Sequence, residues 1–137
     1  MPRKRAEPDV DTDRGRFAYD ALNRTIHERA RLGIMASLAA HPTGLLFPDL
    51  RRYCDLTDGN LNRHLQVLVD AGLVDVAKEG QGRGSQSLCK LTKRGRDELA
   101  AYVAALERVV ADAAAVAKIA DGNKAKSHGA LRPGWST

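Results

Sequence analysis

The chain has 137 residues, of which 43% are hydrophobic and 28% are charged, so length and composition indicate one globular domain and exclude a disordered or fibrous protein. Lysine and arginine number 22 against 17 aspartate and glutamate residues, and the formal net charge of +5 favours a polyanionic partner. No stretch approaches the ~20 apolar residues that a membrane span needs, and the first 16 residues lack the apolar segment of a secretory signal, so no membrane partner is expected.

The two ends of the chain have the composition of flexible tails. Residues 1–15 mix proline, glycine, arginine and aspartate without periodicity, and residues 121–137 are rich in glycine, lysine and serine. We therefore expect the folded domain to lie within residues 16–120.

The first half of this domain predicts three short helices and a brief strand. Apolar residues recur at helical spacing over 17–26, and again in a second helix that stops before Pro42. Residues 45–46 form the brief strand in this interpretation. Pro48 suits the first position of a third helix.

Residues 57–74, TDGNLNRHLQVLVDAGLV, make up the most informative segment. Thr57 is a good N-cap, and Gly72 supplies a left-handed stop, so a fourth helix should run to Ala71. Three leucines share its inner face: Leu61, Leu65 and Leu68. The outward residues, with Asn60 at the border, are Gly59, Asn62, Arg63 and Gln66.

A β-hairpin with a glycine-rich tip follows this helix. The segments LVDVAKE (73–79) and SLCKL (87–91) predict two strands, and residues 79–85 form the tip. Lys78 and Arg83 would neutralise phosphates, while the glycines let the loop follow a nucleic-acid backbone. The residues predicted to contact DNA from this hairpin are Lys78, Gln81, Arg83 and Ser85.

The last helix, capped by Thr92 and expected to end near Ala120, carries a long apolar stripe. Its apolar positions step by three and four over about three heptads, as in helices that pair with another helix. We predict a homodimer whose interface, with help from the first helix, uses Tyr19, Leu22, Leu99, Tyr102, Val103, Leu106, Val109, Val110 and Ala113.

Three helices followed by a hairpin define a winged helix-turn-helix, a mainly α fold with a β-hairpin wing (α+β) and here a long C-terminal dimerisation helix. In such a fold the helix directly before the hairpin, here the 57–71 helix, can enter a DNA major groove. Arginine can donate twice to guanine, and asparagine or glutamine can pair bidentately with adenine. The outward face of the 57–71 helix therefore predicts base reading.

Three runs of the sequence carry a resemblance: IHERARLGIMASLA, LTDGNLNRHLQVLVDAGLV and LTKRGRDELAAYVAALE. Together with a GRGSQ-type wing, they resemble the winged-helix transcriptional regulators related to the MarR and ArsR repressors, over about residues 17–110. The resemblance implies a homodimer with one recognition helix per half-site, and DNA contacts by Thr57, Asn60, Asn62, Arg63 and Gln66. The wing departs from the relatives, because SQSLCKL replaces a more basic, aromatic strand.

The cysteines and histidines do not form a metal-ligand pattern. Cys54 and Cys89 are 35 positions apart and make neither a CxxC pair nor a disulfide framework, which favours the cytoplasm. Cys54 falls on the apolar side of its helix and is interpreted as a small core residue, with redox sensing left open. No metal and no cofactor is expected.

These observations predict a sequence-specific regulator that binds double-stranded DNA at a pseudo-palindromic operator and acts as a repressor. The alternative is a winged-helix module that joins a protein assembly without reading DNA sequence. No catalytic motif is recognisable, so an enzyme is not expected. The sequence leaves open whether a small-molecule effector acts on the protein.

Overall fold

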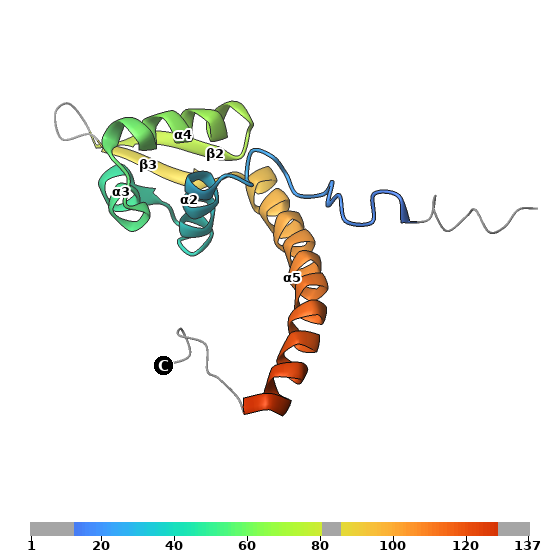
Figure 1. The fold of residues 1–137 in the computed structure, drawn as a ribbon. Coiled ribbons are helices and arrows are strands. Elements are labelled where there is room, and N and C mark those ends of the chain that lie inside the picture. The colour runs from blue at the N-terminus through green and yellow to red at the C-terminus, as the bar shows by residue number, and fades with distance from the viewer. Residues whose placement is uncertain (1–12, 81–85, 129–137) are drawn as a thin grey trace, which may run out of the picture.

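The computed structural model describes residues 13–80 and 86–128, with side chains through Val116 and at Lys118. The chain forms a winged helix with a long C-terminal helix, so the predicted fold class is confirmed (Figure 1). In chain order the elements are α2 (Arg29–Ala39), β1 (Leu45–Leu46), α3 (Phe47–Cys54), α4 (Asp58–Asp70), β2 (Val74–Glu79), β3 (Gln86–Leu91) and α5 (Lys93–His128).

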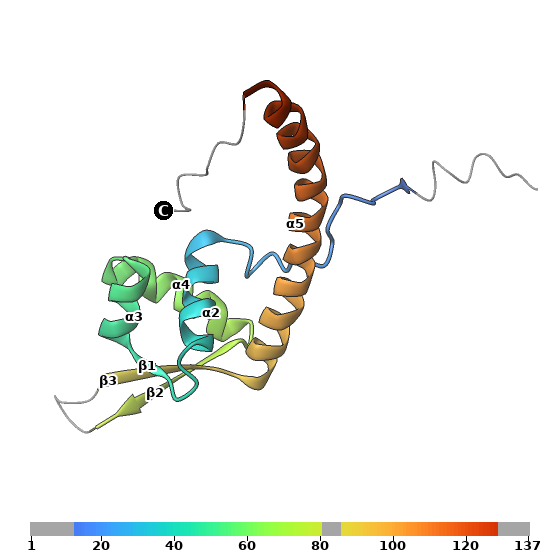
Figure 2. The same cartoon turned by 90° about the horizontal axis from the view of Figure 1, so that it is seen from below.

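The strands form one antiparallel sheet in the order β1-β3-β2. Strands β2 and β3 are the predicted hairpin, and Val74 pairs with Leu91 at its base. The brief strand β1 pairs with β3 on the other side, placing Leu45 opposite Cys89. Figure 2 shows α2, α3 and α4 gathered on one side of this sheet, and α5 leaving from the base of the hairpin.

The core is aliphatic, as the low aromatic content requires. Helix α2 contributes Ile34, Met35 and Leu38, and α4 contributes three leucines, all at most 5% exposed. Leu73 and Cys89 close the core from the sheet side. This packing fixes α4 against α2 and the hairpin and leaves its opposite face in solvent.

The predicted helix over 17–26 is wrong, because this segment is a series of turns. Tyr19 adopts a left-handed backbone conformation with φ of 51°, which interrupts a right-handed helix. The side-chain oxygen of Asn23 accepts hydrogen bonds from the backbone N–H groups of Thr25 (2.8 Å) and Ile26 (3.1 Å), a local alternative to helical bonding. The segment still anchors to the domain, because Ile26 is fully buried.

Helix α5 continues to His128, beyond the end predicted near Ala120. The helix thus includes residues 121–128 of the segment expected to be a tail, while 1–12 and 129–137 lie outside the described residues. Gly122 costs a helix interior only ~1 kcal/mol relative to alanine, which does not stop a helix already formed. Like the other described helices, α5 is not apolar enough to cross a membrane.

Candidate nucleic-acid interface

Helix α4 begins at an exposed and well-capped N-terminus. The Thr57 hydroxyl accepts a hydrogen bond from the backbone N–H of Asn60 (3.1 Å), as the sequence predicts for an N-cap. Asp58 in the first turn forms an ion pair with Arg51 of α3 (3.0 Å). The start of α4 is thus oriented by its own cap and by the preceding helix.

The two faces of α4 differ sharply in exposure. Leu61, Leu65 and Leu68 are at most 5% exposed and pack into the core. The residues predicted to face outward are all exposed: Thr57, Gly59, Asn60, Asn62, Arg63 and Gln66. Their predicted orientation is therefore confirmed, whereas their contact with DNA stays a prediction.

The outward polar side chains are held by weak surface hydrogen bonds within the helix. Arg63 donates to the Oδ1 atom of Asn60 (3.2 Å), and Gln66 donates to the Oδ1 atom of Asp70 (2.8 Å). Exposed hydrogen bonds of this kind contribute little net free energy, since water competes for both partners. These groups are consequently free to exchange partners with a base edge.

His64 belongs to the buried face of α4, a role that the sequence analysis missed. The side chain is among the core residues and only 6% exposed, with its Nδ1 atom 3.2 Å from Arg31 and 3.8 Å from a carboxylate oxygen of Glu28. Burial lowers the pKa of His64 because it disfavours the charged imidazolium. Its place between Leu61 and Leu65, which puts it on the inner face of the helix, was the sequence signal for this burial. The neutral ring helps to hold α4 against the start of α2.

One of the predicted wing residues, Lys78, lies within the described part of the hairpin. Lys78 is exposed on β2, opposite Ser87 of β3. The other predicted wing residues, Gln81, Arg83 and Ser85, lie outside the described residues.

Two residues predicted for the dimer interface are buried in the chain's own core instead. Leu99 is 9% and Tyr102 is 2% exposed, and the Tyr102 hydroxyl lies 2.7 Å from the Nδ1 atom of His27. The first turns of α5 pack against the core of their own domain, so these two residues do not belong to the predicted dimer interface. Of the others, Val103, Val110 and Ala113 are exposed, and Leu22, Leu106 and Val109 are half-buried.

The irregular N-terminal segment runs beside α5 and is bound to it. The Asp112 carboxylate accepts hydrogen bonds from Arg16 (2.9 and 3.1 Å) and from the Tyr19 hydroxyl (2.6 Å). These three bonds, those from Arg16 first, lower the pKa of Asp112 to about 2. Asn23 donates to Glu98 (2.7 Å) nearer the domain. Tyr19 thus packs along α5 without a helix around it.

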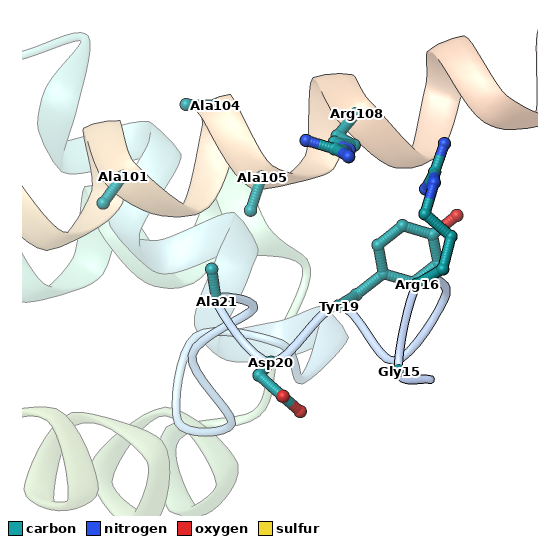
Figure 3. A pocket seen from close by; sticks show the side chains of 9 residues that line it. All are labelled: Gly15, Arg16, Tyr19, Asp20, Ala21, Ala101, Ala104, Ala105 and Arg108. Carbon is teal, nitrogen blue, oxygen red and sulfur yellow. The ribbon is translucent and has the colours of Figure 1, made fainter. Parts of the chain in front are cut away.

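A cleft of about 500 Å³ opens between this segment and α5. Figure 3 shows Ala101 and Ala105 pointing toward Ala21 across the cleft, while Asp20 points away from α5. Arg16 and Arg108 lie toward the distal end. The small alanine side chains leave the backbone of α5 closely approachable along this side.

The thiols are separate and buried to different degrees. Cys54 is half-buried, with its Sγ atom 3.6 Å from the Ser37 hydroxyl, and burial raises the pKa of Cys89 to about 11. Within the part of the chain that the structure describes, no three histidine, cysteine or acidic residues form a group that could hold a metal ion.

Comparison with known proteins agrees with this geometry. Residues 30–110 match the family model of the winged helix DNA-binding domain. A transcriptional regulator homologue from Pyrococcus horikoshii OT3 is 29% identical, with a TM-score of 0.61, over 66% of this chain and 88% of that one. A MarR-family regulator from Enterococcus faecalis V583 is 18% identical, with a TM-score of 0.62, over 86% and 97% of the two chains. No match is found among curated proteins.

A structure of S. aureus MepR bound to DNA shares the fold, with 15% identity and a TM-score of 0.55 over 89% of this chain and 94% of that one. The fold and the exposed polar face of α4 are those of a winged helix DNA-binding domain, and the fold is shared with these MarR-family structures. The chain belongs to the winged helix DNA-binding domain family.

Proposed function

We propose that this protein binds double-stranded DNA sequence-specifically, as a homodimer that places one α4 helix in each half-site of a pseudo-palindromic operator. The observation that carries the proposal is the outward face of α4, where Asn62, Arg63 and Gln66 are exposed side by side. A major groove ~12 Å wide admits one helix, so only this face would meet base edges. We accordingly name α4 the recognition helix.

Each outward group has a defined chemical use in the groove. Arg63 can donate to the O6 and N7 atoms of guanine, and Asn62 or Gln66 can pair with the N6 and N7 atoms of adenine. An added Cβ at Gly59 meets no atom within 4 Å, so the glycine leaves room for DNA near the helix start. Thr57 and Asn60 lie at the N-terminus, where backbone N–H groups favour a phosphate.

The exposed apolar stripe of α5 supports the homodimer. Val103, Val110 and Val116 are 43%, 60% and 69% exposed, although valine is more often buried. Exposed alanines on the same helix, among them Ala104, Ala111 and Ala114, would permit close approach of a helix from a second copy. A two-fold axis would then place the recognition helices ~34 Å apart, which is about one turn of DNA.

We further propose that the dimer represses transcription in the cytoplasm by occupying promoter DNA. The free thiols of Cys54 and Cys89 are compatible with that reducing compartment. Repression would be tested with a reporter that carries the selected operator in its promoter. Increased reporter expression on adding the protein would contradict repression while leaving DNA binding intact.

The central test is selection of bound sequences from random duplex DNA, followed by affinity measurements over a salt series. A sequence-specific dimer should enrich a pseudo-palindrome, and its affinity should fall steeply with salt because phosphate contacts release counterions. Competition with a scrambled duplex of equal length is the control. A protein that enriches no sequence and shows no salt-dependent binding would instead be the interaction module considered above.

A further inference from the structure

The end of the recognition helix and the start of α5 meet in one closely packed joint. After α4 the chain turns through Gly72, with φ of 78°, into Leu73 and β2. Helix α5 begins at Lys93, two residues after the last residue of β3. Because Val74 and Leu91 are partners at the base of the hairpin, these two ends are neighbours in space.

Thr92 ties the two ends together with three hydrogen bonds. Its backbone N–H donates to the carbonyl oxygen of Leu73 (3.1 Å), and its hydroxyl donates to the carbonyl oxygen of Gly72 (2.7 Å). The same hydroxyl accepts from the backbone N–H of Gly95 (2.8 Å). One side chain therefore caps α5 and holds the turn that follows α4.

Gly95 brings the backbone of α5 directly against that turn. A Cβ added at Gly95 would lie 3.0 Å from the carbonyl carbon of Leu73, and nearer still to the carbonyl oxygen. The obstructing atoms are backbone, so a rotamer change cannot relieve the overlap. Any larger residue at this position would have to move α5 away from Leu73 or distort the turn.

We propose that Gly95 and Thr92 are positioning residues for DNA binding, which set the separation of the two recognition helices by fixing the axis of α5. This inference rests on the proposed function. Val110 lies 15 residues beyond Gly95, or about 22 Å along the helix at 1.5 Å per residue. Even a tilt of ~5° at Gly95 would therefore shift the interface by roughly 2 Å.

The wild-type protein provides the first test. Binding is measured by fluorescence anisotropy on duplexes that carry one selected half-site, or two half-sites at the selected spacing and at one base pair more or less. Two linked sites gain affinity only if both can engage at once, so a fixed joint predicts a loss of roughly 100-fold at either altered spacing. Equal affinity at all three spacings would overturn the proposal.

Substitutions test the two residues directly. Gly95→Ala and Thr92→Val should lose affinity for the selected spacing, by roughly 10-fold or more, while keeping wild-type affinity for a single half-site and a dimeric sedimentation coefficient. Thr92→Ser keeps the hydroxyl and should restore the wild-type profile. Gly33→Ala is the matched control, because its Cβ would meet only the Cys54 Sγ atom at 4.0 Å.

The outcomes distinguish a failure of the positioning role from a failure of the proposed function. A Gly95→Ala protein with the wild-type spacing profile would overturn the positioning role. If Gly95→Ala does not fold, the wild-type spacing series and the comparison of Thr92→Val with Thr92→Ser still test whether the joint sets the spacing. A wild-type protein that selects no two-half-site sequence would overturn the proposed function itself, and with it this inference.

Discussion

Helices α4 and α5 both present a long face to solvent, but the two faces differ in chemistry. On α4 the inward leucines are covered within the chain, and the outward residues, apart from Gly59 and the 37% exposed Val67, are polar. On α5 the chain buries Leu99 and Tyr102, whereas Val103, Val110 and Val116 farther along are exposed. A polar face is stable in water and available to a polar ligand, whereas a continuous apolar face favours a protein partner. The proposed function therefore assigns DNA recognition to α4 and assembly to α5.

Placing a carboxylate in the α5 stripe should have the largest effect. In Val110→Asp a charge would be buried between two copies, which costs several kcal/mol, so the protein should sediment as a monomer. Affinity for the two-half-site operator should then fall roughly 100-fold, because the halves no longer bind together. Val76→Asp, at a 43% exposed valine of the hairpin, is the control for oligomeric state. A tight dimer in Val110→Asp would place the interface elsewhere.

Removing a base-reading group from α4 should have the next largest effect. Arg63→Ala and Gln66→Ala should each lose ~1–3 kcal/mol of discrimination at one base position, and the dimer should persist. Selection of bound sequences from random DNA measures the change. Lys93→Ala, which removes an exposed charge from the start of α5, is the control. An unaltered sequence preference in both α4 variants would remove this face from base recognition.

A phosphate contact from the hairpin should matter less and affect all sequences equally. Lys78→Ala should weaken binding to specific and scrambled duplexes alike and reduce the slope of log affinity against log salt by about one. Gel-shift titrations over a salt series give that slope. If Lys78→Ala instead changed base preference, the hairpin would be entering a groove.

The smallest effect is expected where the N-terminal segment binds α5. The pKa of Asp112, lowered to about 2, is below the ~3.9 of an unfolded aspartate, so its ion pair stabilises the fold above about pH 4 and is lost as the pH falls through about 2. The difference in unfolding free energy between wild type and Asp112→Asn should therefore shrink toward acid pH. Urea denaturation from about pH 7 to pH 2 measures it.

The control for this prediction is Asp97→Asn. Asp97 pairs with Lys93 across an exposed turn of α5, so its loss should change stability little at any pH. Parallel stability profiles for wild type and Asp112→Asn would show that the contact with Arg16 and Tyr19 does not hold the segment.

Elements with local signals could be predicted from the sequence. Helix α4 has a threonine cap, an inward leucine row and a glycine stop, each decided by residues within a few positions. The hairpin follows from alternating residues on either side of a glycine-rich tip, and its pairing is confirmed. The outward orientation of Arg63 and Gln66 follows from the same helical period.

Features that depend on distant contacts could not be predicted in this way. The 17–26 segment has helical spacing, yet the Asn23 turn and binding to Asp112, more than 90 positions away, impose another conformation. Periodicity also assigns Leu99 and Tyr102 to the same stripe as Val110, because it cannot show where the domain surface ends. The joint at Gly95 depends on a backbone neighbour brought there by strand pairing.

With the proposed homodimer, the exposed distal part of α5 would link the folding of this protein to its concentration. The side chains from Ala113 to Val116 are all exposed, and an unsupported helical segment is only marginally stable in water. Pairing with a second copy would supply the missing stabilisation by mass action. Helix content and melting temperature should accordingly rise with protein concentration, so that dilution frays the distal turns before it disturbs the winged-helix core.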